Sequence, residues 1–305
     1  MATATRAAYG KALAELVQER EDIVVLDADL SGSTKTAEAR KVCPQRHFNM
    51  GIAEGNMMSV AAGLAASHKI AYASTFAMFA AGRAYEQIRN SIGYPNLNVK
   101  VCATHAGISV GEDGASHQCV EDLTLMRVIP NMHVFQPCDA AQTRAIIRMV
   151  ADISGPCYVR LGRLGVEDVY NTNEKFEMGK GKVLKQGNKV AIIASGLMVQ
   201  QCLKAAELLD FEPTIVDMFS IKPIDKELIA KLAMSHDCII SAEEHSVIGG
   251  LGGAIAEVLA GLKVACPQYM IGLNDEYGRS GKPQDLLKYY HLDAESIADF
   301  IKKHL

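Results

Sequence analysis

The residues with the clearest chemical potential lie between Thr104 and Leu123, where two histidines stand among acidic residues and glycines. His105 and His117 are suited to moving protons near neutral pH, and Asp113 could bind a hydroxyl group. Polar, glycine-containing segments of this kind form the loops at strand ends where α/β proteins build their sites. The same three residues could ligate a metal, but their spacing matches no standard zinc pattern. We therefore interpret the segment as a catalytic loop and expect no metal site in it.

Three further segments carry residue types that suit a functional site. Glu54 opens a helix of small and apolar residues, although an acidic first turn also simply stabilises a helix through its dipole. Phe76 and Phe79 stand three residues apart, which places both rings on one helical face and is common in protein cores. Arg163 follows a strand in VRLGRLG, where a guanidinium could hold a phosphate or lie unpaired at the surface. Each segment taken alone leaves both interpretations open.

The elements that must position these residues alternate along the chain. Short β-branched runs and amphipathic stretches follow one another, which predicts α/β domains with mainly parallel sheets. In the first part we expect strands at 23–26, 70–73, 99–103, 133–135 and 158–161, and helices at 54–66, 80–92 and 139–150. In the second part we expect strands at 190–194, 214–217, 238–242 and near 269–271, and helices at 197–209, 226–233 and after 249–253.

A polar, glycine-containing stretch at 171–187 is the expected linker between two domains. We predict two doubly wound α/β domains with mainly parallel sheets, the first at 1–170 and a smaller one at 188–305. A glycine-rich turn in the second domain, IGGLGGAIAEVLA, is loosely similar to a dinucleotide-binding fingerprint but lacks its spacing. A tight strand-to-helix packing turn is therefore preferred there.

The composition is that of a folded globular protein, with 49% hydrophobic and 22% charged residues among 305. The net charge of −4 includes no acidic or basic block, which argues against nucleic acid and against a membrane surface as partners. No apolar run reaches the roughly 18 residues of a membrane span, and the N-terminal segment is a charged amphipathic helix, not a signal peptide. Eight scattered cysteines without a CxxC pair indicate reduced thiols, so a cytoplasmic protein is expected.

In their order along the chain, these segments resemble the transketolase family, and the resemblance covers essentially the whole sequence. GEDGASHQ is similar to the family's substrate loop, NMGIAEGNM to the segment with the cofactor-activating glutamate, and STFAMF to the stretch that stacks on the cofactor. LDADLSGS and YGRSGKPQDLL match further tracts of the family. The resemblance implies a thiamine-diphosphate pyrimidine-binding domain followed by a transketolase C-terminal domain. It also implies transfer of a two-carbon ketol unit from a ketose phosphate to an aldose phosphate.

The resemblance also implies roles for individual residues. Glu54 would bond N1′ of the cofactor's aminopyrimidine, Phe79 would stack on that ring, and Phe76 would line the same pocket. His105 and His117 would bond substrate oxygens and shuttle protons. The remaining substrate contacts would come from four positions: Asp113 at a sugar hydroxyl, and Arg6, Ser33 and Arg163 at the far end of a phosphorylated sugar. Because the family's last domain builds the dimer, Glu243, Glu244 and His245 are expected at an interface or at the surface.

One part of the family pattern has no counterpart in this sequence. The family binds the diphosphate and its divalent metal through a GDG motif and a later asparagine, and the chain contains no GDG. The chain also begins where the second domain of a full-length enzyme would begin. We therefore expect a split transketolase, in which an N-terminal partner subunit supplies the ligands of Mg²⁺ and completes the cofactor site. An α2β2 heterotetramer acting on sugar phosphates is the expected assembly.

Two alternatives stay open at this stage. A glycine, Gly82, stands where a tyrosine near the cofactor would be expected, and GRAYEQIRN is similar to deoxyxylulose-phosphate synthases and to β subunits of 2-oxo acid dehydrogenases. The chain could thus belong to a thiamine-diphosphate enzyme that acts on a 2-oxo acid. It could also be a non-catalytic scaffold subunit, although a scaffold has no need of Glu54, Asp113 and the two histidines.

Overall fold

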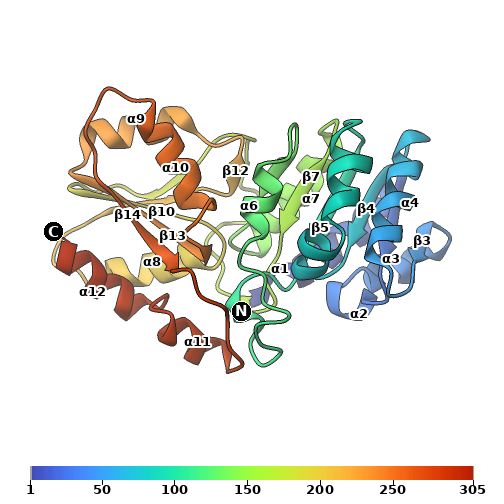
Figure 1. Cartoon of the computed structure of the whole chain (residues 1–305), viewed down its shortest axis with the longest axis horizontal. Helices are drawn as coiled ribbons and strands as arrows, with labels where there is room; N and C mark the ends of the chain where they lie inside the picture. Colours follow the sequence, from blue (N-terminus) through green and yellow to red (C-terminus); the bar gives the residue numbers. More distant parts are fainter. Residues whose placement is uncertain (1, 305) are drawn as a thin grey trace.

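The computed structural model describes residues 2–304, so the outermost residue of each expected domain lies outside it. Two α/β units lie side by side, one built on a seven-stranded and one on a five-stranded sheet (Figure 1). Both sheets are mainly parallel and carry helices on both faces, which confirms the fold class predicted from the alternating pattern. Among the described residues, no helix combines the length and the apolar character that crossing a bilayer requires.

The larger sheet has the strand order β12–β6–β7–β5–β4–β2–β3. All of its neighbours pair in parallel except β12, which runs antiparallel to β6. The strands are β2 (Ile23–Asp27), β3 (His47–Asn49), β4 (Ile70–Ser74), β5 (Val99–Ala103), β6 (His133–Phe135), β7 (Cys157–Arg160) and β12 (Ser220–Lys222). The central strands are buried along their whole length because helices cover both sheet faces.

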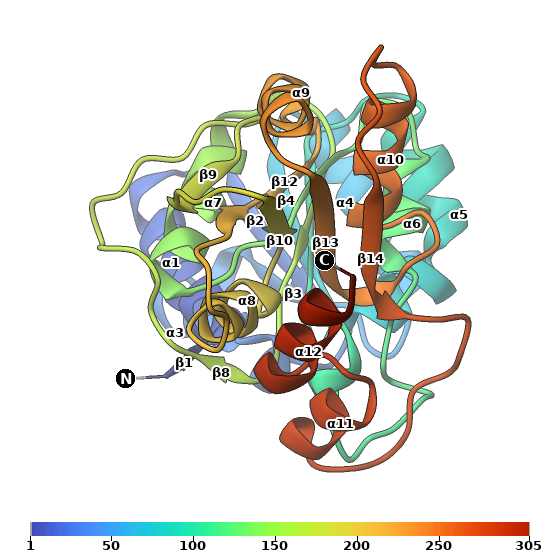
Figure 2. The same ribbon diagram turned by 90° about the vertical axis from the view of Figure 1, so that its left-hand side faces the viewer.

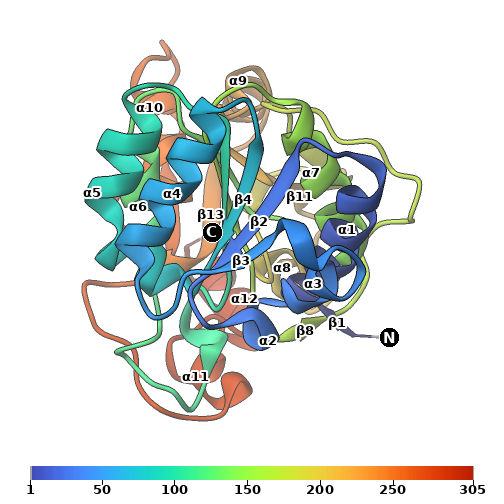
Figure 3. The ribbon, with the colours of Figure 1, turned by 90° about the vertical axis from the view of Figure 1, so that its right-hand side faces the viewer.

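Helices cover both faces of this sheet (Figure 3). One face carries α1 (Thr5–Glu19), α3 (Ala37–Val42) and α7 (Ala140–Asp152), and the other carries α4 (Glu54–Ala66), α5 (Tyr85–Gln87) and α6 (Asp122–Arg127). The helix expected at 80–92 is present, but it is wound largely as a π-helix, in η2 (Met78–Arg83) and η3 (Ile88–Gly93). Single π-helical turns are rare in proteins, and those that occur are often found at functional sites. Short helical turns α2 (Ser31–Thr34), η1 (Pro44–Arg46) and η4 (Ile108–Val110) lie in loops.

The smaller sheet has the order β14–β13–β10–β11–β9, and only β9 is antiparallel. Its strands are β9 (Lys182–Lys185), β10 (Val190–Ala194), β11 (Thr214–Asp217), β13 (Cys238–Ser246) and β14 (Gln268–Leu273). One side carries α8 (Met198–Ala206), α11 (Pro283–Tyr289) and α12 (Ala294–His304), and the other carries α9 (Lys226–Ser235) and α10 (Leu251–Ala260) (Figure 2). Asp225 starts α9 by accepting the Leu228 amide, a typical N-cap.

The two units share strands and core. β12 follows β11 in the chain yet pairs with β6 of the larger sheet, with Ser220 opposite Phe135. Buried apolar side chains of both units form one cluster, which includes Met126 of the first unit and Val216 of the second. A second pairing, of β1 (Thr3–Ala4) with β8 (Gly165–Val166), ties the N-terminus to the segment after β7. The site described below is therefore held by a single continuous packing arrangement.

Candidate active site

The carboxyl ends of β7, β5, β4 and β2 lie at one edge of the larger sheet, because these strands are parallel neighbours. The segments that leave this edge carry the predicted site residues. Ser33 follows β2, Phe76 follows β4, and His105 follows β5. Arg163 follows β7, and Glu54 begins α4 after β3 at the same edge. Parallel pairing thus brings together residues that are far apart in the sequence, as expected for α/β proteins.

The four predicted aromatic and imidazole rings form one cluster. The rings of Phe76 and His105 are stacked, with centroids 3.8 Å apart and an interplanar angle of 27°. Phe79 stacks against Phe76 at 5.7 Å, and His117 meets Phe79 edge-on at 5.5 Å. The candidate cofactor residues and the candidate substrate residues therefore share one site.

His105 is buried and held from both ring nitrogens. Its Nδ1 lies 2.8 Å from the Thr104 hydroxyl, and its Nε2 lies 3.4 Å from Nη1 of Arg6. A guanidinium only donates hydrogen bonds, so Nε2 accepts and the proton resides on Nδ1. Burial, followed by the positive charges of Arg6 and Arg163, lowers the pKa of His105 to about 3. His105 is consequently a neutral imidazole at any ordinary working pH.

Two guanidiniums flank this histidine. Arg6 donates from Nη1 to the Ser33 carbonyl oxygen at 2.7 Å, and the pairing of β1 with β8 places it next to the segment of Arg163. Arg163 donates to the Val110 carbonyl oxygen and lies 3.3 Å from the Glu112 carboxylate. Burial and the nearby charge of Arg163 lower the pKa of Arg6. Two like charges this close are suited to binding an anionic group between them.

Glu54 has a partner that the sequence did not predict. Its carboxylate is only 2% exposed, yet both of its oxygens accept from Nη1 of Arg83, at 3.2 and 3.3 Å. The Arg83 guanidinium also lies over the Phe79 ring, 4.8 Å from its centroid. A planar, nitrogen-bearing group therefore already lies over the Phe79 ring and is bonded to Glu54. These are the two interactions that an aminopyrimidine would need, so the residues present fit that part of thiamine diphosphate.

The apolar residues near Glu54 in the sequence differ in exposure. Met57 and Phe76 are buried, but Ile52 is 77% exposed. Arg83 could have been anticipated from the sequence, because it follows Phe79 by four residues in one helical segment and such residues are neighbours on a helix surface. The guanidinium itself is half-exposed, which leaves it free to be displaced.

Asp113 stands apart from the cluster. It is exposed on the loop and makes no hydrogen bond or ion pair with any of the described residues. The side chain of Ser33 likewise has no hydrogen-bond partner within 2–304, although its carbonyl accepts from Arg6. Over the same residues, no group of three or more His, Cys, Asp or Glu side chains is placed to hold a metal ion.

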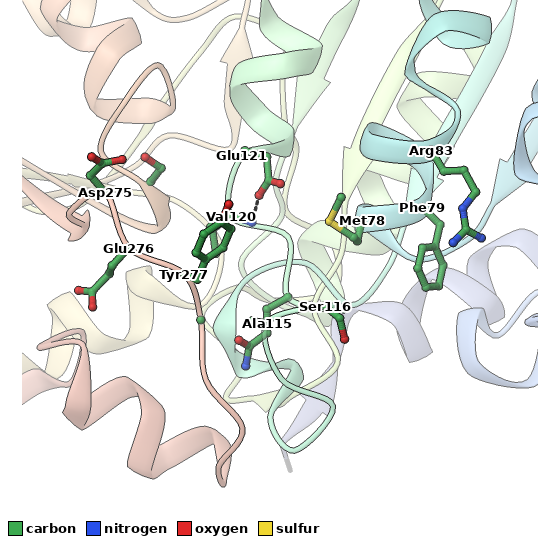
Figure 4. Close-up of a pocket in the computed structure, with 13 residues that line it drawn as sticks. Met78, Phe79, Arg83, Ala115, Ser116, Val120, Glu121, Asp275, Glu276 and Tyr277 are labelled. Carbon is green, nitrogen blue, oxygen red and sulfur yellow. Dashed lines mark hydrogen bonds between the residues drawn. The ribbon is translucent and has the colours of Figure 1, made fainter.

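A cavity of about 650 Å³ opens beside this cluster, between the two units (Figure 4). Phe79 and Arg83 lie on one side of it, and Asp275, Glu276 and Tyr277 lie on the other. Ser116, the neighbour of His117, lines the space between them. This volume is in the usual range for a small-molecule site. The cavity gives a ligand access to Phe79 from the side of the second unit.

The expectation that Glu243, Glu244 and His245 lie at an interface between subunits or at the surface is wrong. All three are buried on β13, inside this chain. Glu243 accepts the Leu251 and Gly252 amides at the first turn of α10, where the helix dipole favours a carboxylate. The amides of the glycine-rich turn are thus occupied by the Glu243 carboxylate, in agreement with the interpretation as a packing turn. An added Cβ at Gly250 would lie 2.0 Å from that carboxylate.

Seven of the eight cysteines are buried and all eight are free thiols. Burial raises the pKa of Cys102 far above its usual range and that of Cys202 to about 12, so neither thiol ionises near neutral pH. Inert, buried thiols behave as small apolar side chains.

The fold is that of a two-unit α/β protein with its candidate site at the strand ends, and comparisons with known proteins identify the family. Family models match over two ranges: the transketolase pyrimidine-binding domain at residues 1–167 and the transketolase C-terminal domain at 179–297. The chain belongs to the transketolase family, which confirms the family predicted from its motifs. Members of this family are transferases that use thiamine diphosphate.

Individual relatives agree with this assignment. A putative transketolase C-terminal section of Methanocaldococcus jannaschii is 52% identical over 98% of this chain and 96% of its own length. A 6-deoxy-6-sulfo-D-fructose transketolase subunit of a Clostridium species is 37% identical over 96% of this chain and 91% of its own length. Human transketolase is 36% identical over 98% of this chain but only 48% of its own length. The chain therefore corresponds to the C-terminal section of that longer enzyme.

A solved structure gives the same picture. A split gene transketolase, described as an inactive β4 tetramer, superposes with a TM-score of 0.90 at 55% identity. The alignment covers 99% of this chain and 98% of that one. The architecture of this chain is thus that of a split transketolase C-terminal section.

Proposed function

We propose that this chain is the C-terminal subunit of a split transketolase, which moves a two-carbon ketol unit from a ketose phosphate to an aldose phosphate. The observation that carries the proposal is the shared ring cluster: His105 stacks on Phe76 while His117 contacts Phe79. Groups that suit a sugar and groups that suit an aminopyrimidine therefore adjoin one another. Ketol transfer needs both kinds of group in one site, because the cofactor and the sugar must meet there.

Each residue has a task in this proposal. Thiamine diphosphate, when bound, supplies the nucleophilic carbon that cleaves a ketose carbon–carbon bond. Glu54 would share a proton with N1′ of its aminopyrimidine, and Phe79 would stack on that ring once Arg83 has moved aside. His105, neutral and buried, would accept a hydrogen bond from a substrate hydroxyl in place of Arg6, while His117 would move a proton at the sugar.

The remaining residues would bind the substrate. Arg6 and Arg163 would hold the phosphate, with Ser33 beside them, because paired guanidiniums favour such anions. Asp113 would bind a sugar hydroxyl from its exposed position on the loop. An N-terminal partner subunit would hold the diphosphate and Mg²⁺, in an α2β2 heterotetramer. This chain has no GDG motif for that purpose.

The first test is ketol transfer from xylulose 5-phosphate to ribose 5-phosphate with thiamine diphosphate and Mg²⁺. We expect transfer by a mixture of this chain with an N-terminal transketolase subunit and none by either protein alone. Transfer by this chain alone would refute the split site. Turnover of pyruvate in place of the ketose would favour the 2-oxo acid alternative. Transfer from 6-deoxy-6-sulfofructose, named for one relative, would keep the chemistry and change the substrate.

A second prediction concerns the anion site. Arg163→Met in the assembled enzyme should raise KM for xylulose 5-phosphate about tenfold or more, because a charge-assisted hydrogen bond contributes roughly 1.5–3 kcal/mol. KM for an unphosphorylated donor such as hydroxypyruvate should stay the same. Arg144→Met is the matched control, since Arg144 pairs with Glu15 at the protein surface, between α7 and α1. Equal losses with both donors would show that Arg163 does not bind the phosphate.

A further inference from the structure

Glu244 is a residue of the second unit whose carboxylate reaches the catalytic loop of the first. It lies on β13, is buried, and accepts the backbone amide of Ser109 at 2.5 Å. Its carboxyl group also rests directly on Gly107: a Cβ added there would lie 2.3 Å from Cδ of Glu244. Gly107 has a φ of +81°, so glycine is required both for this close approach and for the backbone conformation.

Ser109 lies between the two histidines and next to the anion site. It belongs to the helical turn η4, which follows His105 and precedes His117 in the chain. The carbonyl of the following residue, Val110, accepts from Arg163. A displacement of the Ser109 amide would therefore shift the Arg163 contact as well as the loop that carries both histidines.

The second unit holds the rest of this loop through further hydrogen bonds. These are Gln118 Nε2 to the Arg279 carbonyl at 2.8 Å, the Ser246 amide to the Val120 carbonyl at 2.7 Å, and the Leu123 amide to His245 Nε2 at 3.2 Å. All of them lie at or beyond residue 118, near the end of the loop. Between the two histidines, α11 packs against η4, and the hydrogen bond from the second unit is the one that Glu244 makes with Ser109.

We propose that Glu244 is a positioning residue, through which the second domain fixes the substrate loop in the geometry that binds the donor sugar. The inference rests on the proposed function, because that function assigns the loop to the sugar. It gives the second domain a part in substrate binding although none of its residues has been assigned to the substrate.

The chemistry of the contact predicts which substitutions preserve it. Burial raises the pKa of Glu244 to about 7, while the nearby charge of Arg160 opposes that rise. Ionised or protonated, the side chain keeps an oxygen that accepts the Ser109 amide. A glutamine keeps the same oxygen at the same reach, whereas aspartate is one methylene too short and alanine has no acceptor. Glu244→Gln should therefore rescue what Glu244→Asp and Glu244→Ala lose.

The preceding residue supplies a matched control. Glu243 is on the same strand, is equally buried, and has its pKa raised to about 7 by that burial. Its carboxylate accepts the Leu251 and Gly252 amides of its own domain. Glu243→Ala should thus destabilise the protein without moving the substrate loop.

The kinetic test uses the assembled enzyme with Mg²⁺ and thiamine diphosphate. Glu244→Ala and Glu244→Asp should raise KM for xylulose 5-phosphate about tenfold, because each variant loses the one hydrogen bond that positions the loop. The change in kcat should be smaller. The dissociation constant of thiamine diphosphate should not change, because Glu54 and Phe79 lie on other elements. Glu244→Gln should restore KM. An equal rise in KM for Glu243→Ala, or no rise for Glu244→Asp, would overturn the proposal.

A second measurement does not depend on the reaction. Amide hydrogen exchange of the segment containing Ser109, measured on the whole chain, should be slow in the wild type and in Glu243→Ala. It should be at least tenfold faster in Glu244→Ala and Glu244→Asp. Unchanged exchange in both Glu244 variants would refute the link between Glu244 and the loop. An inactive wild-type mixture would instead refute the proposed function, so the two failures are distinguishable.

Discussion

Glu54→Gln is expected to lower turnover by the assembled enzyme about 10²–10⁴-fold, the range typical of a lost proton-transferring group. Glutamine has nearly the same shape and fits the buried position at the start of α4, but it cannot exchange a proton with N1′. Assembly with the partner subunit should be unaffected, because only the carboxylate's charge is removed. Steady-state ketol transfer and size-exclusion chromatography of the mixture measure the two effects.

The control for this substitution is Glu38→Gln. Glu38 also lies in the first turn of a helix, but it is paired with Lys41 at the surface. Its replacement should leave turnover unchanged. If Glu54→Gln were equally harmless, Glu54 would serve only to stabilise its helix, and the chain would be better described as a scaffold subunit.

His105→Ala is expected to have the second-largest effect, a loss of up to about 10²-fold in kcat/KM for the ketose donor, because a substrate hydroxyl loses its buried hydrogen-bond partner. The imidazole is neutral, because burial and the charge of Arg6 hold its pKa at about 3. It therefore acts as a hydrogen-bonding group of fixed charge throughout pH 5–9. The residual activity of the variant should show the same pH dependence as the wild type over that range. A variant that lost a limb of the wild-type profile would show that His105 titrates during the reaction.

The same pKa shift makes the free energy of unfolding depend on pH. The unfolded chain binds a proton on His105 below about pH 6.5, whereas the folded chain excludes it down to about pH 3. The contribution of this group to the free energy of unfolding therefore decreases as the pH falls from 6.5 towards 3. His105→Ala should remove that part of the acid sensitivity. Urea unfolding of wild type and variant at pH 7 and pH 5 provides the comparison.

Much of the fold could be predicted from residue patterns. The strands β5, β6, β10 and β11 and the helix α4 have the predicted bounds, because β-branched or apolar runs are bounded there by loop-forming residues. The strand β12 was not predicted. It is three residues long, lies just before Pro223, and pairs with β6 of the other unit. Pairing between distant segments leaves no periodic signal in the sequence.

The candidate site also contains residues that could be predicted from the sequence and residues that could not. Glu54, Phe79 and His105 carry recognisable chemistry within short motifs, and parallel strands bring such motifs to one edge. Arg83 and Glu244 were missed as site residues for physical reasons. The spacing of Arg83 from Phe79 is visible in the sequence, but its contact with Glu54 joins segments 29 residues apart, and that of Glu244 with the loop depends on how the two domains pack.

The short strand β12 limits how this protein can be recombined with its relatives. A chimera that took the first domain from one family member and everything after the linker from another would carry a foreign β12 against β6. It would also join two halves of one apolar cluster that had not evolved together. Crossover points that take Ser220–Lys222 and the larger sheet from the same family member should be tolerated best. For exchange between homologues, the modular unit is therefore the whole chain.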